Sequence, residues 1–236
     1  MAGEALLDAR ITNSGYSGIQ VIWDVSIDVS PGEVVLLLGS NGAGKTTFLK
    51  SVMGIIEPRA GKVIFKGKDI TKTPLRSRQE LGIYYIAENS YFQSLTIQDN
   101  LRMANLKLGI AESKKRLEEV FTVFPELKDR AGDKCSSLSG GQRKMLIMAK
   151  AIMGSPDLLV IDEPSGGLSP LFVDKIIDVI SMLKGKGISI LLSEQNVEFA
   201  SLADRIFVLD NGRIVFSGSR DDALKNDAIH NAYFNI

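Results

Sequence analysis

The order of apolar and polar positions predicts strands and one helix in the first part of the chain. Residues 4–30 alternate apolar and polar side chains with Gly and Ser between them, which predicts short antiparallel strands. A continuous apolar run at 34–38 predicts a buried strand. Residues 45–53 then follow a helical pattern that stops at Gly54. Further strands are predicted at 62–65 and 82–86.

The rest of the chain alternates strands with helices. Helices are predicted at 97–128, 139–153 and 170–183, and strands at 158–161, 188–192, 206–209 and 213–216. The last two strands flank Asn211-Gly212, a dipeptide typical of a tight hairpin. Such alternation is typical of an α/β protein with a mostly parallel sheet that helices cover on both faces. The helical block near 97–150 interrupts it and is a candidate subdomain.

Composition narrows the classes of function. The chain has 236 residues, of which 44% are apolar and 24% charged, as in ordinary soluble globular proteins. Its 28 basic and 28 acidic residues cancel, so no net field attracts nucleic acid and we expect no nucleic-acid partner. One Cys and one His, His230, exclude a disulfide framework and a His/Cys zinc site.

The sequence has no membrane-spanning pattern. No segment approaches the roughly 18 consecutive apolar residues of a transmembrane helix. The first ten residues lack the basic and apolar regions of a signal peptide, so we expect none. Any connection to a membrane is therefore expected to come through a partner.

A complete phosphate-binding motif follows the first buried strand. Its residues, Gly39, Ser40, Asn41, Gly42, Ala43, Gly44, Lys45 and Thr46, match G-x-x-x-x-G-K-[ST]. Glycines let backbone N–H groups point at phosphate oxygens, and the next helix adds the positive end of its dipole. We expect Lys45 to reach the β and γ phosphates, Thr46 to bind Mg²⁺, and Thr47 to complete the nucleotide contacts. The alternative is a glycine-rich turn with a chance lysine.

Two acids, Asp162 and Glu163, end the strand predicted at 158–161. In P-loop proteins a second buried strand places an Asp beside the Mg²⁺ of the nucleotide, so we expect Asp162 to bind the metal through a water. Glu163 is expected near the γ phosphate, where it would orient or deprotonate the attacking water. The alternative is that both acids only end a strand.

A second anion-binding pattern opens the helix predicted at 139–153. It reads Leu138-Ser139-Gly140-Gly141-Gln142 and combines a hydroxyl, two glycines and a helix N-terminus. With these three motifs at these spacings, nearly the whole chain resembles the ABC-type ATPases. The resemblance implies the P-loop NTPase fold of that family, with a mostly parallel core sheet, an N-terminal antiparallel β subdomain and a helical subdomain. It also implies a head-to-tail dimer, in which each signature closes over the ATP held by the other chain.

The resemblance implies one ABC ATPase domain over residues 1–236. The nucleotide-binding core with the antiparallel subdomain is expected at 4–90 and 155–220. The helical subdomain with the signature is expected at 91–154. The tail at 221–236 is expected to be a docking helix or a surface closure.

Single positions can also be matched to the family. Tyr16 stands where an aromatic ring stacks on adenine, a contact that needs only a π face; a strand-packing Tyr is the alternative. Glu88 stands where the family usually has Gln, in the loop that senses Mg²⁺ and touches the transport partner. A carboxylate is a harder Mg²⁺ ligand than an amide, so the role fits in altered form. Gln93 is the competing residue.

Two other positions depart from the family pattern. Ser169 stands where the loop after the hydrolytic Glu usually ends in Asp, which puts contact between monomers through that Asp in doubt. Gln195 stands where the family has its switch His. An amide can hydrogen-bond a phosphate or a water but cannot hold a proton, so we expect Gln195 to assist and Glu163 to act as the base.

The end of one strand and the end of the chain indicate a branch of the family. Residues 191–196 read Leu-Leu-Ser-Glu-Gln-Asn, and the last residues contain an Ala-Tyr pair. With Glu88, these resemble the LivF branch of importer ATPases, which serves branched-chain amino acids and has close relatives for urea and short amides. The resemblance implies a peripheral protein on the cytoplasmic face of the cell membrane that uses ATP and Mg²⁺. Its implied partners are a second ABC ATPase subunit (a copy or a sister), membrane permeases and, indirectly, a solute-binding protein.

Two other classes of function, a non-transport ABC ATPase and a small-molecule kinase, fit the sequence less well. DNA-repair ABC ATPases carry a long coiled-coil insertion, and the roughly 90 residues between the phosphate loop and the signature leave no room for it. Translation types carry two ATPase units in one chain, whereas this chain carries one. A P-loop kinase of small molecules leaves the signature unexplained. The sequence therefore favours a transport ATPase.

Overall fold

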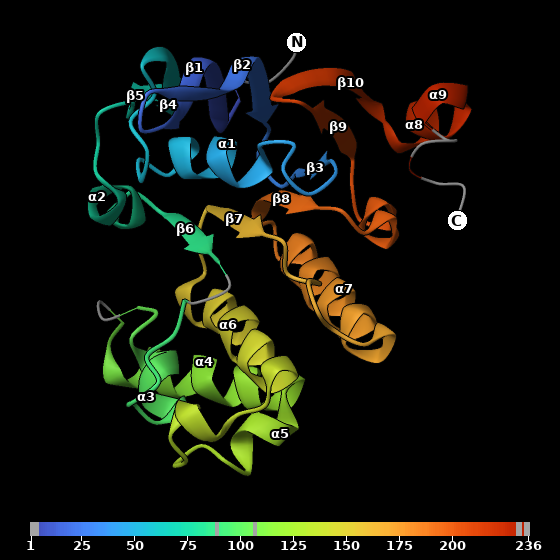
Figure 1. Cartoon of the computed structure of the whole chain (residues 1–236). Helices are drawn as coiled ribbons and strands as arrows, with labels where there is room; N and C mark the ends of the chain where they lie inside the picture. Colours follow the sequence, from blue (N-terminus) through green and yellow to red (C-terminus); the bar gives the residue numbers. More distant parts are fainter. Residues whose placement is uncertain (1–4, 88–89, 106–107, 230–232, 234–236) are drawn as a thin grey trace.

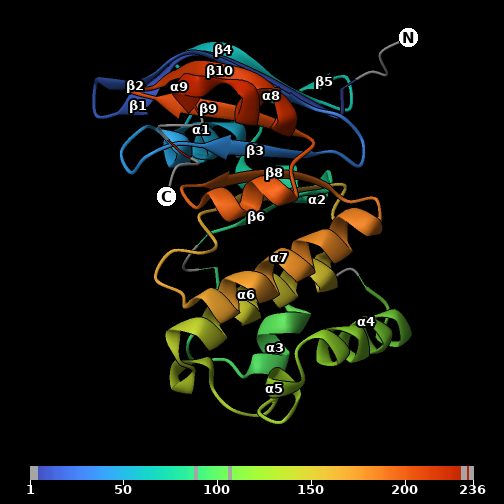
Figure 2. The ribbon, with the colours of Figure 1, turned by 90° about the vertical axis from the view of Figure 1, so that its right-hand side faces the viewer.

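The computed structural model describes residues 5–87, 90–105, 108–229 and 233. The chain forms two sheets with helix α1 (Lys45–Val52) between them, and longer helices cover the far side of the second sheet (Figures 1 and 2). The expected α/β organisation with a mostly parallel sheet is therefore confirmed.

The first sheet is antiparallel, with the strand order β2-β1-β4-β5. Its strands are β1 (Leu7–Tyr16), β2 (Ile19–Val29), β4 (Ala60–Phe65) and β5 (Lys68–Asp69). The alternating pattern at 4–30 therefore forms two long strands instead of several short ones. Ser17 and Gly18 make the turn between them with φ angles of 44° and 91°. The strand expected at 62–65 joins this sheet because it pairs with β1.

The second sheet has the order β10-β9-β3-β8-β7-β6. Its strands are β3 (Val34–Leu38), β6 (Ile83–Ile86), β7 (Leu158–Asp162), β8 (Ser189–Glu194), β9 (Arg205–Asp210) and β10 (Arg213–Ser219). The neighbouring strands are parallel except β9 and β10, which form the hairpin expected at Asn211-Gly212. Both turn residues have positive φ, 45° and 75°, as this hairpin turn requires.

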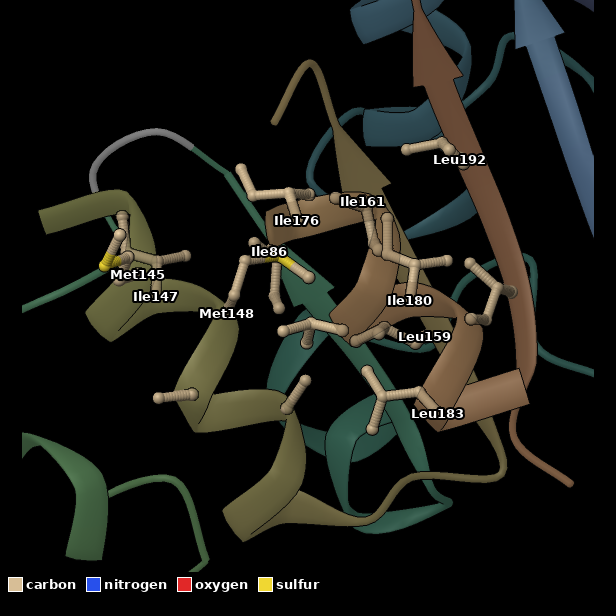
Figure 3. Close-up of a cluster of buried hydrophobic side chains, with 14 of the residues drawn as sticks. Ile86, Met145, Ile147, Met148, Leu159, Ile161, Ile176, Ile180, Leu183 and Leu192 are labelled. Atoms are coloured by element: carbon tan, nitrogen blue, oxygen red, sulfur yellow. The ribbon is translucent and has the colours of Figure 1, made fainter. Parts of the chain in front are cut away.

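Strand β3 lies at the centre of the molecule and is buried on both faces. Val35 and Leu37 point into one apolar cluster with α1 and the antiparallel sheet. Leu36 and Leu38 point into the other cluster, with α6 (Gly140–Gly154) and α7 (Pro170–Gly185). Because both faces of β3 are buried, its residues are apolar without interruption. Figure 3 shows the second cluster, where side chains of α6 and α7 pack on β7 and β8.

The helical block that lies between β6 and β7 in the sequence is divided into several helices. They are α3 (Ile97–Arg102), α4 (Ile110–Val123), α5 (Pro125–Lys128), η1 (Cys135–Ser137) and α6. A helical pattern was expected over 97–128, and one of its breaks lies at Phe124, which leaves the helical region with φ of −125° and ψ of 73°. Pro125 follows and disfavours a helical Phe124 for steric reasons.

The remaining elements are short. They are α2 (Leu75–Glu80), η2 (Val197–Ser201), α8 (Arg220–Lys225) and α9 (Asp227–Ile229). The apolar pattern did not predict α2. His230 lies outside the described residues. Within the described ranges, none of the helices combines the length and the apolar character that a membrane crossing needs.

Candidate nucleotide-binding site

The phosphate loop joins β3 to α1 and lies against the end of β9. Gly44 precedes the helix with φ of 109°, a conformation that side chains other than glycine rarely adopt. A Cβ atom on Gly39 would lie 2.4 Å from the carbonyl oxygen of Leu209, so only glycine fits there. Gly212 N–H donates to the Ala43 carbonyl at 2.9 Å. The hairpin after β9 therefore holds the loop at the N-terminus of α1.

Lys45 is buried under this loop, with 3% of the residue exposed. Its ammonium donates to the carbonyl oxygens of Gly39 at 2.7 Å and Ser40 at 2.9 Å. It also lies 3.0 Å from Oε1 of Glu163. The fold thus brings Lys45 and Glu163 together from distant parts of the sequence. Thr47, the residue directly after the motif, is also nearly buried, with 6% exposed.

Asp162 accepts hydrogen bonds from three hydroxyl groups. Its Oδ1 accepts from Thr46 Oγ1 at 3.1 Å and from Ser193 Oγ at 2.7 Å, and its Oδ2 accepts from Tyr85 OH at 2.9 Å. Burial and the adjacent Asp162 carboxylate raise the pKa of Tyr85 far above its usual range, so this phenol remains a donor. Hydroxyl and carboxylate oxygens are the ligands that Mg²⁺ prefers, so this donor set fits that ion.

The sequence alone did not predict a role in the site for Tyr85 and Ser193. Tyr85 lies in β6 and Ser193 in β8, and β7, which carries Asp162, runs between these two strands. Parallel strands bring their carboxyl ends to one edge of a sheet, where ligand sites form. The sequence feature that could have identified both residues is a polar side chain near the carboxyl end of each strand next to β7.

Glu163 follows β7 in a strained backbone conformation. Its φ of 47° lies in the left-handed region, which is unfavourable for residues other than glycine. Its N–H donates to the carbonyl of Ser193 at 3.0 Å. The side chain is 39% exposed and reaches the ammonium of Lys45. The sharp turn after β7 therefore directs this carboxylate to the phosphate loop.

A second acid, Glu194, holds two loops of the site and was not assigned a role from the sequence. Only 2% of it is exposed. Its carboxylate accepts from the backbone N–H groups of Ser165 at 2.8 Å, Gln195 at 2.9 Å and Asn196 at 3.1 Å. The loop after Glu163 and the loop of Gln195 are therefore anchored to one group. The side chain of Gln195 itself is exposed.

A polar cleft of about 470 Å³ opens between these residues. Its lining includes Thr46, Lys50, Tyr85, Lys144, Asp162 and Glu163. The cleft thus contains cations, carboxylates and hydroxyl groups, as a site for phosphate groups and a divalent cation requires. Lys50 and Lys144 were not expected in this site.

The signature residues form the first turn of α6. Ser139 Oγ accepts from Gln142 N–H at 3.3 Å, and Gln142 Oε1 accepts from Ser139 N–H at 3.0 Å, a reciprocal cap. Arg130 also donates to Gln142 Oε1 at 3.0 Å. Across the described part of the chain, no hydrogen bond or ion pair joins residues 138–142 to residues 39–47. Within one chain the two anion-binding motifs are therefore separate.

The residues that were matched one by one to the family pattern lie in different parts of the structure. Tyr16 is the last residue of β1 and is 45% exposed, which leaves its ring available for stacking. Ser169 is the N-cap of α7. Gln93 is exposed. Glu88 lies outside the described residues.

Comparison with known proteins identifies relatives over most of the chain. A family model described as ABC transporter matches residues 22–166. The branched-chain amino acid transport protein BraG of Pseudomonas aeruginosa is 36% identical over 92% of this chain and 94% of its own length. The probable branched-chain amino acid transport protein LivF of Archaeoglobus fulgidus is 36% identical over 91% of this chain and 92% of its own length.

Similar identity is found to a protein of another transport system. LptB of Escherichia coli K12, an ATP-binding protein of lipopolysaccharide export, is 35% identical over 97% of both chains. Among solved structures, the ATP-binding subunit of an ABC transporter superposes with a TM-score of 0.84 at 31% identity. That match covers 98% of this chain and 96% of the other.

Proposed function

The chain belongs to the ABC transporter family as an ATP-binding subunit and ATPase, and we propose that it powers the import of branched-chain amino acids. The P-loop ABC ATPase fold expected from the sequence is confirmed. The solute is a proposal that the similarity to BraG and LivF supports. The observation that carries the catalytic part is that Asp162 and Glu163 line one cleft, with the buried Lys45 paired to Glu163 and Thr46 bonded to Asp162.

We expect Lys45 to exchange its contact with Glu163 for the β and γ phosphates of ATP. The ammonium already lies at the loop, so little reorganisation is needed. Thr46 and Asp162 would hold Mg²⁺, which neutralises phosphate charge when bound. Glu163, released from Lys45, would orient or deprotonate the attacking water, and Gln195 would supply hydrogen bonds alone.

A dimer is proposed because the phosphate loop and the signature are separate within one chain. Tyr16, the loop residues 39–47 and the metal-binding residues would hold ATP in one chain. Ser139, Gly140, Gly141 and Gln142 of a second chain would close over its γ phosphate. The second chain is either another copy or a sister ATPase subunit.

The proposed setting is the cytoplasmic face of the cell membrane, where permease subunits would bind this chain. A solute-binding protein would deliver the amino acid to the permeases. Affinity purification of the chain from membranes, followed by identification of the permeases and binding protein, tests this assembly. Uptake of labelled leucine by the reconstituted complex tests the solute.

A second function is favoured by one observation, the 35% identity to LptB over 97% of the chain. A subunit of a lipopolysaccharide exporter would co-purify with permeases that carry no amino acid. Importers of urea, short amides or another polar solute, and a non-transport ABC ATPase, are the remaining alternatives. Co-purification with ribosomes or DNA, and with no permease, would favour the last of these.

Glu163→Gln tests the catalytic proposal. The amide keeps the shape of the side chain but cannot accept a proton, so ATP binding should persist while turnover falls at least about a hundredfold. An ATP-dependent dimer should accumulate on size-exclusion chromatography. Turnover at the rate of the unmodified chain would contradict the role of Glu163. Lys45→Ala is the companion variant, which should lose ATP affinity because it removes the charge that faces the phosphates.

A further inference from the structure

Helix α6 carries two lysines that hold the two loops beside the cleft. Lys144 donates to the carbonyl oxygen of Gly166, in the loop after Glu163. Lys150 donates to the carbonyl oxygen of Ser90 at 2.5 Å, in the segment after β6. The lysines are six positions apart in the sequence, which corresponds to about 9 Å along a helix. One rigid element therefore contacts both borders of the site.

Two polar side chains hold the backbone of the loop after Glu163. Glu194 anchors it at Ser165, and Lys144 anchors it at Gly166, one residue further on. Lys144 also lines the same cleft as Glu163. Because Glu163 is held in a left-handed conformation, its position depends on where this loop is fixed.

The second loop follows the strand that carries Tyr85. Two described residues of that segment contact each other, because the Ala87 N–H donates to Ser90 Oγ at 3.0 Å. Lys150 reaches Ser90 from a half-buried position, with its Nζ 5.9 Å from the centre of the Phe92 ring. Burial lowers the pKa of Lys150, a sign of the poorly solvated surroundings in which a hydrogen bond is strong.

The start of α6 is fixed to the same region. A Cβ atom on Gly141 would lie 3.1 Å from the ring of Phe172 in α7, so the glycine allows the signature turn to pack closely there. The signature, Lys144 and Lys150 lie on one helix, and that helix contacts both Gly166 and Ser90.

We propose that Lys144 and Lys150 are positioning residues that couple the position of the signature helix to Glu163 on one side and to the Tyr85–Asp162 pair on the other. The inference rests on the proposed function, because it assumes ATP hydrolysis at Glu163. A ligand bound at the N-terminus of α6 would then set the geometry of the carboxylates in the same chain. Neither lysine needs to touch the reacting atoms.

The test compares Lys144→Met and Lys150→Met in the purified full chain, with Lys144→Arg and Lys150→Arg as conservative variants. Lys114→Met, an exposed lysine of α4, is the matched control. Each Met variant should lower kcat about tenfold, as expected when one charged hydrogen bond is lost at a positioning contact. The Kd for ATP of Lys150→Met should stay within about twofold because Lys150 lies outside the lining of the cleft, and each Arg variant should regain most of the rate.

The outcomes separate this inference from the proposed function. If the unmodified chain hydrolyses ATP, Glu163→Gln does not, and both Met variants keep the full rate, the coupling is wrong and the function stands. A parallel loss of ATP affinity and kcat in Lys150→Met, or no recovery of either rate with Arg, would also overturn the coupling, because it indicates general damage. Turnover in Glu163→Gln at the full rate would instead remove the proposed base.

Discussion

Asp162 shows how a single side chain is prepared for a metal ion. Three hydroxyl groups from α1, β6 and β8 surround its carboxylate, and they hold both oxygens in place without adding charge. Groups that orient a metal-binding carboxylate commonly affect metal affinity strongly. Thr46 is also expected to bind the metal and the Ser193 carbonyl also holds Glu163, so Tyr85 is the best of the three for testing one hydroxyl contact.

Tyr85→Phe should therefore raise the Mg²⁺ concentration needed for half-maximal ATPase activity about tenfold. The substitution removes the hydroxyl and keeps the ring, so the packing of β6 is preserved. Tyr84→Phe is the matched control, since that phenol donates to the Ala104 carbonyl at 2.5 Å, away from Asp162. Magnesium titrations of activity measure the effect, and equal curves for the two variants would contradict the role of Tyr85.

Helix α2 illustrates an element that depends on one polar side chain. Arg78 is completely buried and donates to the carbonyl oxygens of Val52, Ile70, Thr71 and Thr73. Burial lowers its pKa to about 10, which still leaves it charged at neutral pH. The guanidinium thus joins the end of α1, the segment after β5 and α2. The apolar pattern gave no sign of this helix because Arg78 is its only buried residue.

Arg78→Met should lower the free energy of unfolding by about 3 kcal/mol, because buried carbonyl groups lose their donor. Arg76→Met in the same helix is the control, since the Arg76 side chain is 91% exposed. Urea unfolding followed by circular dichroism gives both values. Equal stability of the two variants would show that Arg78 is dispensable for this corner of the fold.

The two sheets are held together across the whole molecule by α1 and by contacts at one edge. Arg205 of β9 donates to both carboxylate oxygens of Asp28 of β2, at 2.8 and 3.0 Å. The N–H of Trp23 donates to the Gly212 carbonyl at 2.8 Å. The hydrogen bond from Arg205 lowers the pKa of Asp28 below its ordinary value of 3.8. Folding and protonation are therefore linked at this pair.

The sign of that linkage can be tested with Asp28→Asn. A carboxyl whose folded pKa is lowered stabilises the protein above its unfolded pKa and loses that contribution as the pH falls through the folded value. At pH 7 the variant should be less stable by about 0.5 kcal/mol, as for partly exposed pairs. The difference should decline once the pH falls below 3.8. In an Arg205→Met background it should be absent at every pH, and its persistence there would assign it to another contact.

The motifs of consecutive residues were determined by the sequence alone. Residues 39–47, 138–142 and 162–163 carry their chemistry within a short stretch, and the surrounding apolar runs indicate the strand or helix beside each. The same runs predicted the parallel sheet, because a strand buried on both faces needs apolar residues throughout. The family followed from those motifs.

The tertiary structure decided which distant side chains complete the site. Tyr85 and Ser193 meet Asp162 because β6 and β8 flank β7, an order that no local pattern encodes. Lys144 and Lys150 reach their loops only after α6 packs under the sheet. Hydrogen bonds of this kind depend on strand order and helix placement, and these follow from the packing of the whole core.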